Sequence, residues 1–132
     1  MESTMKGGTP DISQQVCSYR RVLELISNKW STLVLYALED GGLRYGEIRR
    51  RIEGISQKML TQTLRQLERD GLVRREVTPT VPLTVDYSLT ALGETLLLPM
   101  RELKQWTNDY FDQVESARKT YDQAEQEDEA EQ

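Results

Sequence analysis

Apolar residues recur at three- and four-residue spacing through the first half of the chain, a pattern that predicts helices. A regular period of this kind predicts a first helix at about 18–27. The stretch 30–38 is apolar nearly all round, which predicts a buried central helix that stops at the Gly41-Gly42 pair. A short third helix fits 45–51. Three positions are expected in the core or in structural roles: Trp30, Leu33 and Met59.

The segment 56–71 is the most sharply divided part of the chain. Ser56 is a good N-cap for a helix, and Gly71 followed by Leu72 fits a Schellman ending. One narrow sector of this helix holds Ser56, Leu60, Leu64 and Leu67. That side is therefore expected to pack inward. The opposite sector is polar and basic, with Lys58, Gln62, Arg65 and Arg69 at its centre and Thr61 and Gln66 beside them.

A hairpin and a long helix are predicted after this segment. Residues 73–77 and 85–89 alternate between apolar and polar positions, as strands do, and the prolines between them belong in the connecting tip. Apolar residues then return to helical spacing over 92–110. Pro99 lies inside that stretch, so either the helix kinks there or two helices meet.

The order of these elements predicts a single winged helix-turn-helix domain. A helix, a three-residue turn containing Gly54, a second helix and then a hairpin are typical of that fold. The fold class is mainly α with a small β-hairpin (α+β). We expect a disordered N-terminus at 1–10, the DNA-binding and dimerisation domain at 11–115, and a disordered acidic tail at 116–132.

The last helix is too long to bury its apolar stripe on so small a domain. Pairing with a symmetry mate would cover the stripe, so we expect a homodimer through the first and last helices. A ligand pocket is the weaker alternative for the aromatic residues of that stripe. The expected interface residues are Tyr19, Leu96, Met100, Leu103, Trp106 and Tyr110.

Composition narrows the possible functions. The chain has no histidine and one cysteine, so the common catalytic pairs and most metal sites are unavailable, and we expect neither an enzyme nor a cofactor. No run approaches the roughly twenty apolar residues of a membrane span, no signal peptide opens the chain, and one cysteine makes no internal disulfide. These features predict a cytoplasmic protein.

Charge is divided along the chain. The net charge is −5. Residues 112–132 carry a net −6, whereas residues 44–75 hold nine basic and four acidic side chains, a net +5. Because charges beyond about 10 Å are screened at moderate salt, the local field is what a ligand meets. An acidic protein can therefore still bind nucleic acid.

The polar face of 56–71 predicts contact with double-stranded DNA, with an ordinary solvated helix face as the alternative. N-terminal positions of such a helix reach deepest into a major groove. The candidates for base edges or the nearest phosphates are Ser56, Gln57, Lys58, Thr61, Gln62 and Arg65. The candidates for the DNA backbone are Arg69, one or two of the run Arg49, Arg50 and Arg51, and one of Arg74 and Arg75. The last two point to opposite faces of a strand, so at most one should reach DNA.

The chain resembles the HxlR-type family of bacterial winged-helix regulators, distant relatives of the MarR type. The resemblance spans about residues 17–111 and rests on Cys17, Ile26–Trp30, Leu43–Arg50, Gly54–Gln62, Leu67–Val73, Pro82 and Tyr87–Gly93. It implies a homodimer that binds operator DNA and regulates neighbouring genes. In several members a cysteine near the start of the first helix senses electrophiles or oxidants. The wing departs from the family pattern, because Leu83 stands where proline is common and Thr84 stands where arginine is common.

Cys17 has two interpretations. A single cysteine is usually a small buried hydrophobe. If the first helix begins near Ser18, however, Cys17 caps its N-terminus, where unpaired N–H groups and Arg20 and Arg21 favour a thiolate. The resemblance favours the reactive role. A disulfide could then form only with Cys17 of a second copy, whereas an adduct or a mixed disulfide needs no such pairing.

Together these features predict a dimeric regulator, a repressor rather than an activator, on an inverted-repeat operator. Blocking a promoter needs no contact with polymerase, which favours repression. Thiol modification of Cys17 by an electrophile or oxidant, or a small-molecule inducer at the dimer interface, would control it. The alternative is a winged-helix protein-interaction module without DNA specificity.

Overall fold

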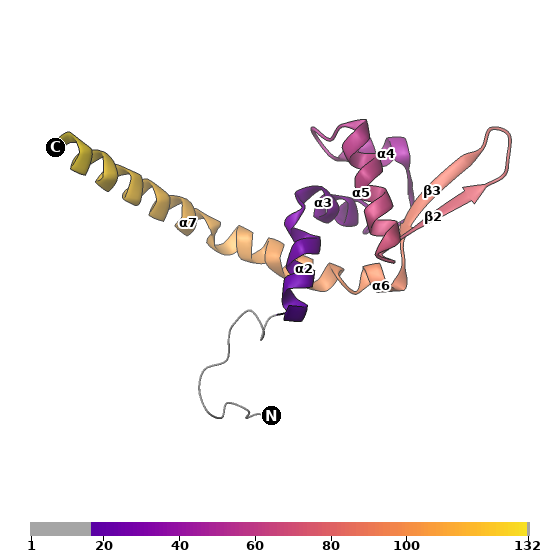
Figure 1. The fold of residues 1–132 in the computed structure, drawn as a ribbon, viewed down its shortest axis with the longest axis horizontal. Coiled ribbons are helices and arrows are strands. Elements are labelled where there is room, and N and C mark those ends of the chain that lie inside the picture. Colours follow the sequence, from indigo (N-terminus) through magenta and orange to yellow (C-terminus); the bar gives the residue numbers. More distant parts are fainter. Residues whose placement is uncertain (1–16, 132) are drawn as a thin grey trace, which may run out of the picture. The chain divides into compact units, whose positions relative to one another are not determined.

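The computed structural model describes residues 17–131, in two compact units that meet in sequence at Glu94 and Thr95 (Figure 1). The predicted disorder of residues 1–10 falls outside the described residues. The elements of the first unit are α2 (Cys17–Ser27), α3 (Lys29–Ala37), β1 (Leu43–Arg44), α4 (Tyr45–Arg51), α5 (Gln57–Arg69), β2 (Val73–Thr78), β3 (Thr84–Leu89) and α6 (Ala91–Glu94). The second unit contains α7 (Leu97–Glu131). The predicted winged helix-turn-helix, mainly α with a small sheet, is confirmed.

The core of the first unit lies where α3, α4 and α5 meet. Its largest fully buried side chains include Leu35, Ile48, Leu60 and Leu67. Truncating one such leucine to alanine removes apolar contacts and leaves a cavity, at a cost of about 2–5 kcal/mol. The prediction of a buried central helix is confirmed for Val34, Leu35 and Leu38 of the 30–38 stretch. It is wrong for Leu33, which is 41% exposed, because one side of α3 is left uncovered.

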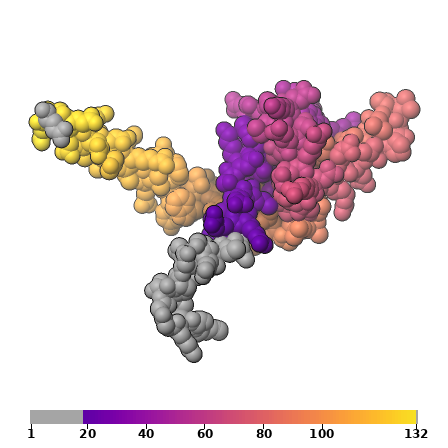
Figure 2. Space-filling model, in the orientation of Figure 1, coloured from indigo at the N-terminus to yellow at the C-terminus, as the bar shows by residue number. Residues whose placement is uncertain are grey.

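The hairpin belongs to a three-stranded antiparallel sheet in the order β1-β3-β2. In the hairpin, Val73 pairs with Leu89 and Thr78 with Thr84. The additional strand β1 pairs Leu43 with Tyr87. Strand β1 is only two residues long, which is too short to show an alternation of apolar and polar positions. The sequence pattern therefore does not predict it. The tip of the β2–β3 hairpin extends away from the helices of the first unit, as a wing does (Figure 2).

Both ends of α5 are fixed as the sequence predicts. At the N-terminus, Ser56 Oγ accepts a hydrogen bond of 3.1 Å from the backbone N–H of Met59. At the C-terminus, Gly71 has a φ of +76°, a conformation that favours glycine. The N–H of Leu72 donates to the carbonyl of Leu67 at 3.0 Å, which is the Schellman bond.

Thr90 ties the end of α5 to the beginning of α6. Its Oγ1 donates to the carbonyl of Gly71 at 2.6 Å and accepts from the N–H of Gly93 at 3.0 Å. Gly93 is buried, and a Cβ at that position would overlap the carbonyl oxygen of Leu72. The contacts of Thr90 and Gly93 thus hold α6 against the C-terminal end of α5 and the chain that leads into β2.

The second unit is a single long helix. Pro99 lies in the first turn of α7, where its missing N–H would have no helical partner. Helix α6 ends at Glu94 and α7 begins at Leu97, so one helix ends and another begins just before Pro99. Residues 116–131 are helical, whereas the fading apolar pattern predicts a disordered tail. Glutamate, glutamine, alanine, lysine and arginine have high intrinsic helix propensity, which an amphipathic pattern does not report.

Among residues 17–131, no helix combines the length and the apolar character needed to cross a bilayer.

Candidate nucleic-acid interface

The outer face of α5 is polar, basic and exposed. Leu60, Leu64 and Leu67 are buried on the inner face, as their spacing predicts. The outer residues Gln57, Lys58, Gln62, Arg65 and Arg69 are exposed. Five residues of the N-terminal half line one shallow hollow on this face: Gln57, Lys58, Thr61, Gln62 and Arg65. Guanidinium, ammonium and amide groups in such an array match the acceptors and donors of phosphates and base edges.

Two of the predicted DNA-contacting hydroxyls already have partners. Ser56 Oγ caps α5, and Thr61 Oγ1 lies 3.2 Å from Tyr45 Oη. The same Tyr45 hydroxyl is 2.9 Å from the carbonyl oxygen of Gln57, to which it donates. Tyr45 therefore holds the first turns of α5 from the start of α4. The sequence pattern does not predict these bonds, because the partners of Tyr45 lie 12 and 16 residues away.

The arginine run of α4 separates into two roles. Arg49 and Arg50 are exposed. Arg51 Nη1 instead donates to the carbonyl of Ala37 at 3.3 Å, at the C-terminal end of α3. A cation at a helix C-terminus satisfies an unpaired carbonyl and interacts well with the helix dipole. Arg49 and Arg50 are thus the two of the run that remain available to a phosphate.

The two arginines of β2 lie on opposite faces of the sheet. Arg74 pairs across the ladder with Ser88, and Arg75 pairs with Tyr87. Arg75 and Tyr87 line a hollow together with residues of α5, so their side chains are on the α5 side. The tip of the wing carries exposed Val81 and Leu83 and no basic side chain.

One residue of α5 is buried without a hydrogen bond. Thr63 is almost fully buried, and its Oγ1 has no partner within the described chain. It adjoins the leucine stripe, and the apolar pattern does not single it out. Burying a hydroxyl in this way costs free energy.

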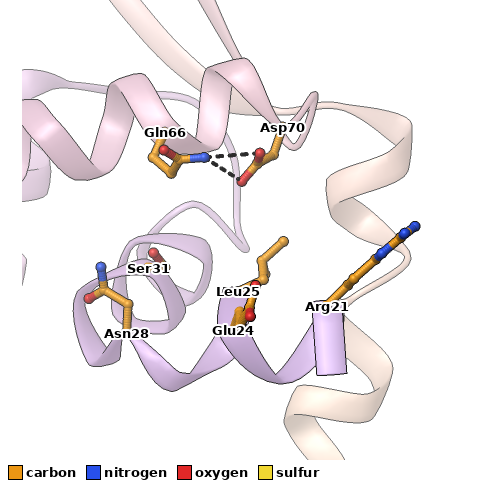
Figure 3. Close-up of a pocket in the computed structure, with 7 residues that line it drawn as sticks. All are labelled: Arg21, Glu24, Leu25, Asn28, Ser31, Gln66 and Asp70. Atoms are coloured by element: carbon orange, nitrogen blue, oxygen red, sulfur yellow. Dashed lines mark hydrogen bonds between the residues drawn. The ribbon is translucent and has the colours of Figure 1, made fainter. Parts of the chain in front are cut away.

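A second hollow, of about 460 Å3, lies between α2, the start of α3 and the second half of α5 (Figure 3). Its lining residues are Arg21, Glu24, Leu25, Asn28, Ser31, Gln66 and Asp70. Gln66 Nε2 donates to both carboxylate oxygens of Asp70, at 3.1 and 3.2 Å. Asn28 Oδ1 accepts from the N–H of Trp30 and so caps α3. Three of the polar side chains in this hollow therefore already form hydrogen bonds within the helices that line it.

The predicted dimer-interface residues differ in exposure. Tyr19, Leu103, Trp106 and Tyr110 are exposed, and the rings of the last two lie 5.9 Å apart. Leu96 is half-buried. Met100 is only 3% exposed in the single chain, so little of its side chain is accessible to a second copy.

Cys17 is the first residue of α2. The helix thus begins one residue earlier than the Ser18 start that the capping interpretation assumes. The first turn of α2 contains no acidic residue.

The chain matches a known protein family over most of its length. A family model described as HxlR-like helix-turn-helix matches residues 25–115. The chain is 43% identical over 109 residues to the HTH-type transcriptional regulator YdeP of Bacillus subtilis (strain 168), covering 80% of this chain and 85% of YdeP.

Two solved regulators have the same fold. The redox regulator HypR in its reduced form is 41% identical, with a TM-score of 0.71 over 75% of this chain and 98% of its own. The reduced form of the transcriptional regulator YodB from B. subtilis is 34% identical, with a TM-score of 0.65 over 70% of this chain and 91% of its own. HypR is also known in an oxidised form and YodB in a diamide-treated form. The chain belongs to the HxlR-like helix-turn-helix family and is a transcriptional regulator of the helix-turn-helix type.

Proposed function

We propose that this regulator acts as a homodimer on an inverted-repeat operator and represses the genes beside it. The observation that carries the proposal is the outer face of α5, where Lys58, Gln62 and Arg65 are exposed between a fixed helix N-terminus and the wing. Each α5 would enter a major groove, and the wing would touch the adjacent backbone.

A dimer binds two half-sites at once, so its overall affinity for the operator is much higher than the affinity of one copy for one half-site. Recognition helices about 34–36 Å apart meet successive major grooves on one side of the duplex. A displacement of a few ångströms in that spacing prevents both half-sites from being bound at once, and the avidity of the pair is lost. A signal that changes how two copies pair would therefore release the operator.

Cys17 is our candidate for receiving that signal. Support comes from its place at the start of α2 and from the similarity to HypR, which is described as a redox regulator. The Cys17 thiolate would add to an electrophilic carbon of a quinone, whose oxygen then takes up a proton. Alternatively, it would attack a small-molecule disulfide, form a mixed disulfide and release the other half as a thiolate.

Enrichment of duplexes from a random library tests the DNA-binding proposal. The wild-type protein should enrich an inverted repeat whose half-site centres are about 10–10.5 base pairs apart or a multiple of that. Gln62→Ala serves as the matched variant and should relax the preference at one base position in each half-site, at a cost of about 1–3 kcal/mol. A protein-interaction module without DNA specificity would enrich no sequence.

A separate comparison tests Cys17. Binding of the enriched duplex by wild type and by Cys17→Ser is measured before and after treatment with a quinone or with oxidised glutathione. We expect wild type to lose affinity and Cys17→Ser to keep it. Equal responses of the two proteins would rule out sensing at this thiol.

A further inference from the structure

The cleft between α5 and the base of the wing is lined by two arginines from different elements. Arg65 comes from α5 and Arg75 from β2, and both border one hollow of about 320 Å3. The other lining residues are Tyr45, Thr61, Leu64, Glu68 and Tyr87. Within residues 17–131, neither arginine forms an ion pair with a carboxylate. Two cations thus border one shared space, and no carboxylate of the described chain is ion-paired with either.

The charges in this cleft favour an anionic occupant. The guanidinium groups of Arg65 and Arg75 bring two positive charges, and Glu68 brings one negative charge. Like charges that share a space repel each other, and an anion between them relieves the repulsion of both. A hydrogen bond from a guanidinium group to an anionic oxygen is charge-assisted and about twice as strong as one between neutral groups.

We infer that this cleft binds one backbone phosphate of duplex DNA, with Arg65 and Arg75 as the two sides of a clamp. The inference rests on the proposed DNA binding. When α5 occupies a major groove and the wing touches the adjacent backbone, a DNA strand has to cross the gap between them. A phosphodiester at that crossing accepts hydrogen bonds from guanidinium groups on either side.

The clamp assigns different roles to residues that the sequence pattern groups together. Arg65 also borders the outer face of α5, so a base edge is the other partner it could reach. Arg75 enters the cleft from the wing, and its neighbour Arg74 lies on the far face of the sheet. Arg65 and Arg75 therefore position the duplex, and the reading of bases is left to Gln57, Lys58 and Gln62.

The salt dependence of binding tests this clamp. Association constants are measured for wild type, Arg65→Gln, Arg75→Gln and the double variant. The KCl concentration runs from about 50 to about 300 mM, which brackets the physiological ionic strength of about 150 mM. Loss of one phosphate contact lowers the slope of log K against log salt by about 0.9. If both arginines hold the same phosphate, the double variant should lose about 0.9, and a loss of about 1.8 would mean two separate phosphates and overturn the clamp.

Two matched variants accompany these measurements. Arg74→Gln removes the same charge from the far face of the same strand, and its slope should equal that of the wild type. Glu68→Gln removes the one carboxylate that faces the cleft, and it should tighten binding several-fold at low salt. A slope loss in Arg74→Gln equal to that in Arg75→Gln would reduce the effect to general charge and would count against the clamp.

Enrichment from a random library separates the clamp from the proposed function. Arg65→Gln should enrich the same sequence as wild type, because a phosphate contact carries no base information. A changed base in the enriched sequence would assign Arg65 to a base edge and refute the clamp. If wild type itself enriches no sequence, the proposed function fails, and the slopes measured on a random duplex still decide the clamp.

Discussion

Single side chains set how firmly the recognition helix is held. Tyr45 reaches from α4 to the first turn of α5 and to Thr61, while Thr63 faces the core with an unpaired hydroxyl. The first contact orders the helix and the second weakens it. Stability and DNA binding should therefore respond separately to changes at these positions.

Replacing Thr63 with valine should stabilise the protein. Valine keeps the shape of threonine and removes a buried hydroxyl without a partner, so we expect a gain on the order of 1 kcal/mol in the free energy of unfolding. Urea denaturation followed by circular dichroism measures it. Thr63→Ser keeps the hydroxyl and loses the methyl group, so it should lower stability; a loss for Thr63→Val as large as that for Thr63→Ser would show that the hydroxyl is satisfied.

Replacing Tyr45 with phenylalanine should weaken DNA binding more than it weakens the fold. The ring still packs, but the bonds to the Gln57 carbonyl and to Thr61 are lost. Each such bond contributes about 0.5–1.5 kcal/mol to holding the first turns of α5 in place. Binding to the enriched duplex should fall accordingly. In a double-mutant cycle, Thr61→Val should cost less in a Tyr45→Phe background than in wild type. Additive effects would mean that the two hydroxyls act independently.

At the scale of elements, local signals are predictable from the sequence and distant ones are not. The bounds of α5, its Ser56 cap and its Gly71 ending follow from neighbouring residues, and the structure has all three. Strand β1 exists only through its pairing with β3, more than forty residues further along the chain. Residues 116–131 carry a helix-forming composition without an apolar stripe, so periodicity does not reveal the end of α7.

The pairing of Arg65 and Arg75 around one cleft shows the same limit. The sequence places both among the candidates for DNA contact and indicates that Arg74 and Arg75 face opposite ways. It does not say which of the two strand faces meets α5. That depends on how the sheet packs on the helix, which only the folded chain determines.

Removal of the C-terminal part of α7 should strengthen DNA binding at low salt. Residues 116–132 carry a net charge of −4, and their loss removes repulsion from the phosphates. A chain that ends at Glu115 should lose helical circular dichroism signal and bind the enriched duplex several-fold more tightly at 50 mM KCl, a salt concentration at which charges act over about 14 Å. At high salt the gain should disappear; a gain that persists there would point to a cause other than charge.

At the scale of the whole molecule, the exposed aromatic side chains of α7 bear on assembly. Trp106 and Tyr110 lie within the matched part of the family, and Tyr121 lies beyond it on the same helix. All three are exposed in the single chain. A homodimer of the proposed kind would cover the first two.

Trp106→Glu should separate the proposed dimer into single chains. A buried charge without a partner at an interface costs several kcal/mol, so sedimentation should give the mass of one chain and operator affinity should drop by at least tenfold. Tyr121→Glu adds the same charge at another exposed aromatic position of α7 and should leave the mass of the assembly unchanged. Dissociation by both variants would mean that the dimer interface extends along α7 as far as Tyr121.

The two faces of α5 have almost no residue in common. Leucines and caps hold the helix, while Gln57, Lys58 and Gln62 project from it and make no contact that the core requires. Only Ser56 and Thr61 take part in both. Operator preference can therefore drift, or be redesigned, by exchanging a few outward side chains while the scaffold keeps its stability. Such a separation lets duplicated copies of one regulator acquire new targets without first having to fold anew.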